Sequence, residues 1–187
     1  PMDEPPLRRV TMEEASAYLA LRRAAAPKMA LATFLCIISP VALLMLAAMS
    51  EVSRFGISEN AASGIGLCGL LVLVAIGVAL FLTCSAKVRD FAFLEEEPFE
   101  TEYGVSGMVK ERMQDFAGTY SWLNITGTVL CILSAVPLFV SMCMETADVV
   151  YVAAVCLLLI IAGIGCVAFT YGGTIHASME RLLEEGD

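Results

Sequence analysis

The chain has 187 residues, of which 58% are apolar and 17% charged, and its formal net charge is -9. Soluble domains are about 25% charged and 45–50% apolar, so this composition, with a mean hydropathy of +0.78, excludes an ordinary soluble domain. We expect a membrane protein, in which the positions of the positive charges are more informative than their sum.

Four stretches contain no Asp, Glu, Lys or Arg, and each exceeds the roughly 20 residues that a helix needs to cross a bilayer. They are residues 29–50, 60–86, 118–144 and 149–179. The first is too long, and too far behind the start, for a signal peptide. The sequence therefore predicts an all-α polytopic protein with four transmembrane helices in two tandem hairpins. Its parts are a cytoplasmic arm (1–28), the first hairpin (29–86), a cytoplasmic loop with helices (87–117), the second hairpin (118–179) and a cytoplasmic tail (180–187).

The positive charges predict the orientation of these helices. Of 11 Lys and Arg residues, only Arg54 lies outside the arm, the central loop and the tail. Positively charged loops stay on the cytoplasmic side of a membrane. Both termini and the central loop are therefore predicted to be cytoplasmic, and the short loops at 51–59 and 145–148 to face outward.

The arm contains a helix-start signal. Thr11 and Glu14 have the spacing of a capping box, which predicts a helix from Met12 to about Ala26. Pro27 then either begins a new helix or kinks this one. The predicted helix could lie along the lipid surface or pack on the central loop.

Two spans contain a serine near a proline: Ser39 and Pro40 in the first, Ser134 and Pro137 in the third. Proline removes a backbone hydrogen bond and bends a helix, and a nearby serine can bond the freed carbonyl. These four residues are the candidate kink and switch positions. In the second span, Ala62 begins a series of small residues that predicts close helix packing, with a glycine-lined transport path as the alternative.

The central loop is the one sizeable polar region between spans. The second helix is predicted to continue past the lipid and to end before Pro98, and another helix to begin near Val105 or Ser106 and to run on into the third span. Its acidic residues are adjacent rather than convergent and no histidine joins them, so we expect a solvated charge run and not a metal site.

A few polar side chains within or near the spans are further candidates. Apart from Asn60, the first residue of the second stretch, Asn124 is the single amide in any span, so we expect it to bond another helix or headgroup water. Trp122 fits an interfacial anchor. His176, at the end of the last span, is either a pH switch or incidental. The seven cysteines are expected to be buried free thiols; as a redox pair, Cys36 and Cys131 are the best candidates.

The two hairpins repeat one another. A shift of 95 residues superposes Cys36 and its neighbours on Cys131 and its neighbours, and a shift of 88 places Leu94 on Leu182. Both repeats begin on the same side, which excludes an inverted repeat. We expect a parallel repeat with a pseudo-two-fold axis along the membrane normal, in a four-helix bundle with spans one and three in equivalent positions.

Three segments resemble a known family: residues 94–111 (LEEEPFETEYGVSGMVKE), 35–40 (LCIISP) and 130–134 (LCILS). They look like the membrane part of bacterial membrane-bound helix-turn-helix regulators of the Xre type. The resemblance implies a bacterial cytoplasmic membrane and a cytoplasmic DNA-binding domain before the helix at Thr11. It also implies that this chain is an excised membrane domain with no DNA-contacting residue of its own.

The resulting functional hypothesis is a sensing or anchoring domain of a membrane-bound transcriptional regulator, binding a lipid, an amphipathic compound or a protein partner. Self-association into a homo-oligomer is compatible with the glycine-rich second span. The alternative is a small transporter or permease subunit for a neutral or amphipathic compound, although no span contains an Asp, Glu, Lys or Arg for coupling. An enzyme is not expected, since Ser39 and Ser134 have no His or Lys at membrane depth, and no cofactor or metal site is predicted.

Overall fold

The computed structural model describes residues 7–52, 56–145 and 147–184, so the predicted outward positive charge, Arg54, lies outside the described residues. The elements follow the order β1 (Arg8–Val10), α1 (Met12–Glu51), α2 (Glu59–Val88), η2 (Arg89–Phe91), α3 (Phe93–Glu96), β2 (Phe99–Thr101), α4 (Val105–Leu133), α5 (Val136–Cys143) and α6 (Asp148–Glu184). Four helical segments are long and apolar enough to cross a membrane, namely α1, α2 with η2, α4 with α5, and α6. The predicted all-α chain with four membrane-length helices is confirmed.

α1 is one helix of 40 residues, so the expected end at Ala26 is wrong. The capping box at its start is present: the Glu14 amide donates to Thr11 Oγ1 (3.2 Å) and the Thr11 amide donates to the Glu14 carboxylate (3.1 Å). Pro27 lies inside the helix because a proline removes a single backbone bond, and packing on both sides of it holds the helical course. The capped segment is therefore the N-terminal part of α1, continuous with the first span, and not a separate helix along the lipid surface.

The two serine–proline sites differ in structure. α1 continues through Pro40, and the Ser39 hydroxyl donates to the Cys36 carbonyl (2.8 Å), which is the carbonyl that Pro40 leaves without a backbone donor. The third span is interrupted between α4 and α5, with Pro137 in the first turn of α5. The hydroxyl of Ser134 there donates to the Cys131 carbonyl (2.6 Å).

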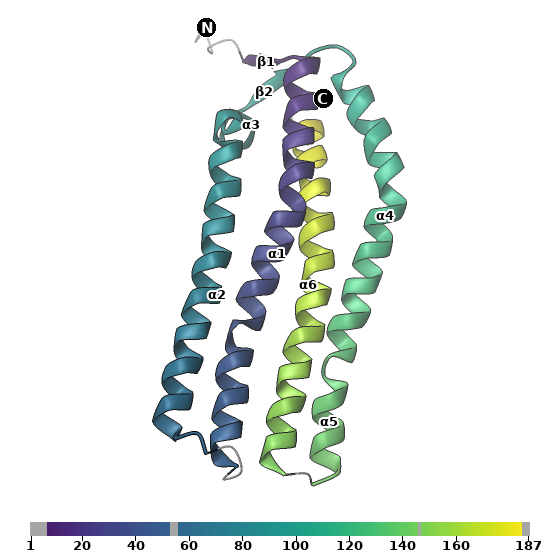
Figure 1. Ribbon diagram of the computed structural model, residues 1–187. Coiled ribbons are helices and arrows are strands. Elements are labelled where there is room, and N and C mark those ends of the chain that lie inside the picture. Colours follow the sequence, from purple (N-terminus) through teal and green to yellow (C-terminus); the bar gives the residue numbers. More distant parts are fainter. Residues whose placement is uncertain (1–6, 53–55, 146, 185–187) are drawn as a thin grey trace, which may run out of the picture.

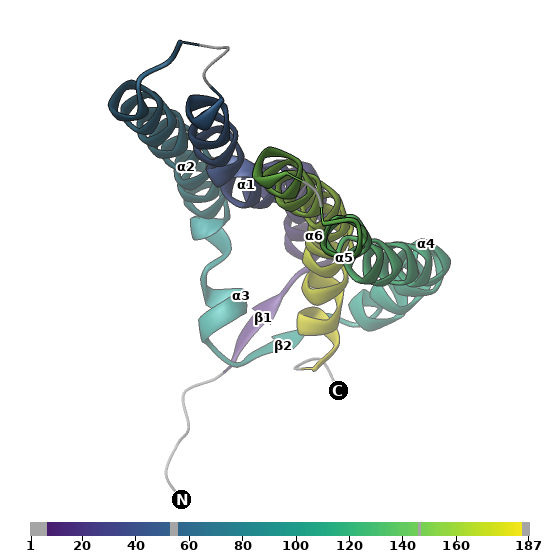
Figure 2. The ribbon, with the colours of Figure 1, turned by 90° about the horizontal axis from the view of Figure 1, so that it is seen from below.

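The four spans form a row in the order α2, α1, α6 and α4 with α5 (Figures 1 and 2). The main helix contacts join α2 to α1, α1 to α6, and α6 to α4 and α5. α1 is thus an inner helix and α4 an outer one, whereas a two-fold axis would make them equivalent. The expected pseudo-two-fold axis, with spans one and three in equivalent positions, is wrong: the four spans lie in a row, and the hairpins are related by a shift along it.

A short parallel ribbon, which the sequence analysis missed, crosses one end of the row. β1 precedes α1 and pairs with β2, which precedes α4, in a register of Arg8 with Phe99 and Val10 with Thr101. The Glu102 amide extends the ladder to the Val10 carbonyl (2.9 Å). Parallel pairing agrees with hairpins that are shifted and not rotated relative to each other.

The best-packed part of the molecule lies at this same end, where the helices extend beyond the apolar spans. Its fully buried side chains are Val10, Ala15, Tyr18, Ala26, Leu94, Phe99, Val105, Val109 and Leu182. We call this part the cap. Leu94 and Leu182, which the 88-residue shift superposes, are both 0% exposed. By contrast, only 11–22% of each span's most apolar window is buried, which leaves wide apolar faces for lipid.

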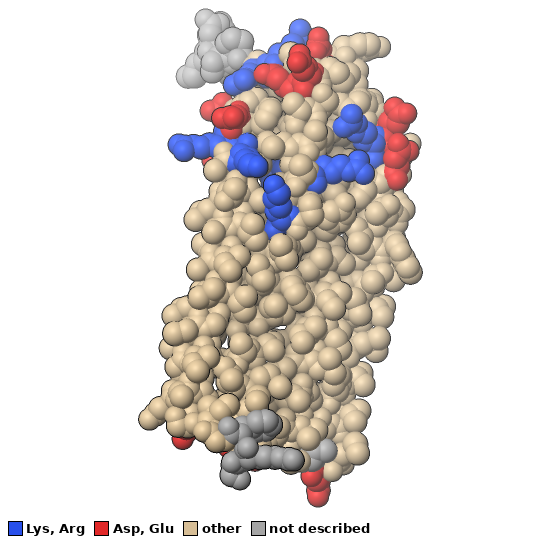
Figure 3. All heavy atoms as spheres, viewed as in Figure 1, with Lys and Arg blue, Asp and Glu red and all other residues tan. Residues whose placement is uncertain are grey.

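Charged side chains gather at the cap end (Figure 3). All ten described Lys and Arg residues lie on β1, the first half of α1, the end of α2, η2, the start of α4 or the end of α6. The face drawn shows only acidic side chains at the opposite end. This distribution is the one that the sequence predicted for a protein inserted with a single orientation.

Candidate functional site

Each hairpin is closed by a glycine facing a cysteine. A Cβ atom on Gly77 of α2 would lie 2.7 Å from Cys36 Sγ, and one on Gly165 of α6 would lie 2.8 Å from Cys131 Sγ. The two contacts superpose under the shifts of 95 and 88 residues, so the repeat is present in the packing. Cys36 and Cys131 lie in different interfaces, and the neighbouring thiol to Cys131 is Cys166. The alternative of a redox pair between Cys36 and Cys131 is therefore excluded, and all seven cysteines are free thiols, although Cys68 and Cys143 are exposed and not buried.

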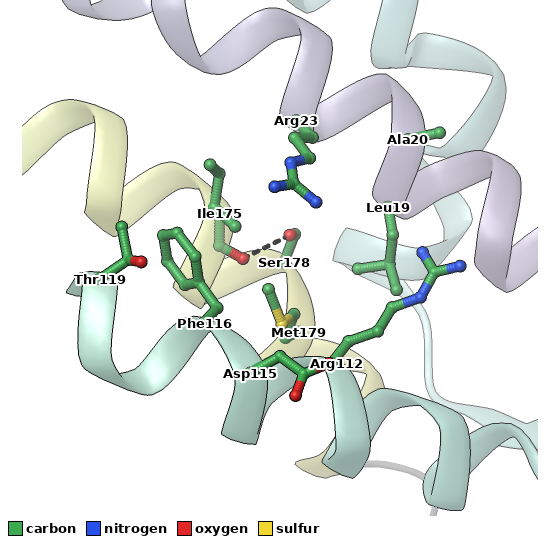
Figure 4. Close-up of a pocket in the computed structure, with 10 residues that line it drawn as sticks. All are labelled: Leu19, Ala20, Arg23, Arg112, Asp115, Phe116, Thr119, Ile175, Ser178 and Met179. Carbon is green, nitrogen blue, oxygen red and sulfur yellow. Dashed lines mark hydrogen bonds between the residues drawn. The ribbon is translucent and has the colours of Figure 1, made fainter.

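A cavity of about 370 Å³ lies in the cap between α1, α4 and α6 (Figure 4). Its lining residues are Leu19, Ala20, Arg23, Arg112, Asp115, Phe116, Thr119, Ile175, Ser178 and Met179. The guanidinium groups of Arg23 and Arg112, from α1 and α4, extend into the space between these helices, and Asp115 lies one turn along α4 from Arg112. The Ser178 hydroxyl is occupied by the Ile175 carbonyl at 2.7 Å.

The two arginines differ from others in the cap. Arg22 forms an ion pair with Glu95, and Arg181 donates to the Leu94 carbonyl at 2.9 Å. Arg23 and Arg112 have no hydrogen bond or ion pair with any residue that the structure describes. Their donors are available to a ligand.

A second hollow of about 410 Å³ lies between the same three helices, within the spans. Its lining residues are Pro27, Ala30, Leu31, Phe34, Leu123, Thr126, Leu130, Ile164, Val167, Ala168 and Tyr171. These are almost all apolar, and Leu31 and Ile164 are half exposed on its edges. Hollows of 300–1,000 Å³ with mostly apolar walls are typical ligand sites.

The two hollows follow one another along the same faces of α1, α4 and α6, and together we call them the groove. On α1 their lining residues follow one another at intervals of three or four positions from Leu19 through Arg23 and Pro27 to Phe34. The same spacing runs along α4 from Arg112 and along α6 from Ser178. Residues at such spacing share one helix face. The groove is therefore cationic in the cap and apolar in the span.

No protein family, curated protein or solved structure matched this chain.

The residues singled out from the sequence lie elsewhere. Ser39, Pro40, Ser134 and Pro137 do not line either hollow. The side chain of Asn124 makes no hydrogen bond to a described residue, and its backbone carbonyl accepts from the Thr128 hydroxyl (2.8 Å). The structure therefore does not show the expected bond from Asn124 to another helix.

His176 lies between α4 and α6, outside the groove. Its ring centre is 4.1 Å from that of Tyr120, and its Nδ1 is 3.9 Å from the Glu180 carboxylate. Trp122, the expected interfacial anchor, is 69% exposed.

Two acidic residues of the central loop form contacts that connect the loop to α1 in the cap. Glu95 pairs with Arg22, and the Glu102 carboxylate accepts from the Met12 amide (3.2 Å), which connects the loop to the start of α1. Among the described residues no group of three His, Cys, Asp or Glu side chains converges on a point that could hold a metal ion.

Sequence reasoning missed Arg23 and Arg112 as site residues. Their position in the sequence could have indicated them, because each arginine lies within two helical turns of the start of a charge-free span. Each also lies on the helix face that lines the apolar hollow farther along the same helix. What the sequence lacked was the adjacency of α1 and α4 to α6.

Proposed function

We propose that this chain is the membrane-embedded sensing or anchoring part of a membrane-bound transcriptional regulator in a bacterial cytoplasmic membrane. The observation that carries the proposal is the continuity of α1, which runs from the apolar span into the packed cap without interruption. A helix of 40 residues is about 60 Å long, so α1 spans the distance from the far end of the row to the cap. A shift of α1 within the membrane would therefore move the cap.

The cap offers a place for the regulatory output. β1 is joined to α1 by Thr11 alone and is paired with β2, so a DNA-binding domain preceding β1 would be held against the cap. In this arrangement the cap end faces the cytoplasm, as the Lys and Arg distribution favours. The chain itself has no role in contacting DNA.

A small transporter or permease subunit for a neutral or amphipathic compound is the second candidate, and the apolar groove is the feature that supports it. The groove lining ends at Phe34, Leu130 and Ile164, within the cap-side part of the spans. That ending favours binding over passage. Purified protein in liposomes that moves an amphipathic dye would favour transport.

The regulatory role can be tested by fusing a reporter's DNA-binding domain to the N-terminal side of the chain. We expect Pro40→Ala and Pro137→Ala to change reporter transcription, because both alter helices that lead from the membrane to the cap. Val129→Ala, at a half-exposed position on α4, is the control and should leave transcription unchanged. Equal transcription in all four proteins, at equal membrane amounts, would contradict the sensing role and leave only anchoring, which cell fractionation of the fusion measures.

A further inference from the structure

We propose that the groove binds one anionic phospholipid of the cytoplasmic leaflet, with its phosphate between Arg23 and Arg112 and an acyl chain along the apolar hollow. The inference deepens the proposed function by naming a ligand. It rests on the membrane orientation proposed above, but not on a connection to DNA.

The headgroup end has the charge and the donors for a phosphodiester. Two guanidinium groups and the Asp115 carboxylate give it a formal charge of +1. Guanidinium groups bind phosphate oxygens through paired hydrogen bonds, and these two have no partner among the described residues. Because Arg23 and Arg112 come from α1 and α4, which α6 separates, a phosphate held by both would bridge two helices that are not neighbours in the row.

The depth of the two arginines also fits a lipid headgroup. Lys28 and Asp115 are the last charged residues before the charge-free parts of α1 and α4. Arg23 and Arg112 lie five and three positions before them, which is about 8 and 5 Å at the rise of an α-helix. The polar region of one leaflet is about 5–8 Å thick. Both side chains can therefore reach the phosphate level.

The apolar end fits an acyl chain. Its hollow begins at Pro27, one helical turn beyond Arg23 on the same face of α1, and is lined by α4 and α6 on its other sides. A phospholipid has an anionic headgroup followed by an apolar acyl chain, and the groove has a cationic end followed by an apolar end. A free phosphate would use only the cap end, and a neutral lipid only the span end.

The test measures lipid binding to the purified full chain in detergent by native mass spectrometry, with phosphatidylglycerol and phosphatidylcholine of equal chain length. Both lipids carry the same phosphodiester, but the choline of phosphatidylcholine adds a positive charge beside the two guanidinium groups. We therefore expect phosphatidylglycerol to bind about tenfold more tightly. Arg23→Gln and Arg112→Gln should each remove most of this preference, and Arg112→Lys should restore part of it. Arg9→Gln, on exposed β1, is the matched control. Equal binding of the two lipids by the unchanged protein would overturn the proposal.

Two further variants distinguish an anionic phospholipid from a free phosphate and from a zwitterionic lipid. Ala168→Phe fills the apolar hollow without touching the charges, so it should weaken phosphatidylglycerol binding about tenfold, with retention of the fold checked by circular dichroism. If Ala168→Phe has no effect and soluble glycerol phosphate competes as well as the lipid, the site binds a free phosphate and the proposal is wrong. Asp115→Asn should strengthen phosphatidylglycerol binding. Tighter binding of phosphatidylethanolamine, lost in Asp115→Asn, would instead assign a zwitterionic lipid and overturn the anionic one.

The two experiments distinguish a failure of the proposed function from a failure of the lipid site. Lipid preference that depends on Arg23 and Arg112, with a reporter that responds to no variant, would retain the lipid site and reject the sensing role. A reporter that responds to Pro40→Ala and Pro137→Ala, with no lipid preference in the purified protein, would retain the sensing role and reject the lipid site.

Discussion

The Sγ atom of Cys36 lies 2.7 Å from the position that a Cβ atom would occupy on Gly77. The backbone carbonyl oxygen of Ala32 is 3.2 Å from the same position, so α1 and α2 approach each other too closely for any side chain there. In the second hairpin, Cys131 and the carbonyl of Gly127 surround Gly165 in the same way. The same contact, a glycine on one helix against a cysteine on the other, thus brings the two helices of each hairpin together.

Adding a methyl group at these contacts should separate the helices. We expect Gly77→Ala and Gly165→Ala each to lower the free energy of unfolding by about 1–3 kcal/mol, the usual cost of overpacking. The measurement is unfolding in mixed micelles with increasing dodecyl sulfate. Gly64→Ala and Gly173→Ala are the controls, because a Cβ atom at either position meets nothing within 4 Å. Equal destabilisation of all four variants would contradict the close approach.

A double variant tests which atom causes the clash at Gly77. Cys36→Ala removes the Sγ atom, so combined with Gly77→Ala it should recover part of the lost stability. Recovery should be smaller for Cys131→Ala with Gly165→Ala, because the Gly127 carbonyl oxygen still lies 3.0 Å from the new methyl group. Purely additive losses in both pairs would count against direct contact.

Arg181 should attach the end of α6 to the central loop. Its guanidinium donates to the carbonyl oxygens of Leu94 (2.9 Å) and Glu95 (3.3 Å). Since hydrogen bonds from charged donors contribute about 1.5–3 kcal/mol, Arg181→Gln should destabilise the cap by a similar amount. Faster amide exchange in α3 would show it. Arg89→Gln, at an exposed position, is the control, and the prediction fails if both variants exchange alike.

The capping box should hold the start of α1. Thr11→Ala removes the acceptor for the Glu14 amide and should cost about 0.5–2 kcal/mol. We expect amide exchange to increase in the first turn of α1 and in β1, which directly precedes it. Ser16→Ala is the comparison, because its hydroxyl donates to the nearby Glu13 carbonyl (2.9 Å) within the same turn at the surface. Unchanged exchange in Thr11→Ala would show that the ribbon alone holds this end.

The orientation can be measured with single cysteines in a variant whose other cysteines are replaced. Cys143, exposed at the end opposite the cap, should react with a membrane-impermeant maleimide added to intact cells. Glu97→Cys, in the exposed part of the central loop, should react only after the cells are opened. The reverse pattern would contradict both the proposed orientation and the lipid site.

Much of the fold followed from local sequence. The charge-free stretches predicted all four spans, the Thr11 capping box placed the start of α1, and Val105 was correctly placed at the start of α4. The errors were also local. The sequence left open whether Pro27 begins a new helix or kinks the first one, and packing keeps α1 continuous through it. The ribbon was missed because each strand is only three residues long.

By itself, the sequence determined the number of membrane-length helices and their pairing within each hairpin, because the length of a charge-free stretch and a short connection are properties of neighbouring residues. Only the tertiary structure decided the order of the helices. That order depends on contacts between distant residues, such as Val10 with Thr101 and Phe34 with Gly163, whose hypothetical Cβ atom would lie 2.9 Å from the Phe34 ring. Once α6 lies between α1 and α4, Arg23 and Arg112 share one groove, a relation that no local pattern contains.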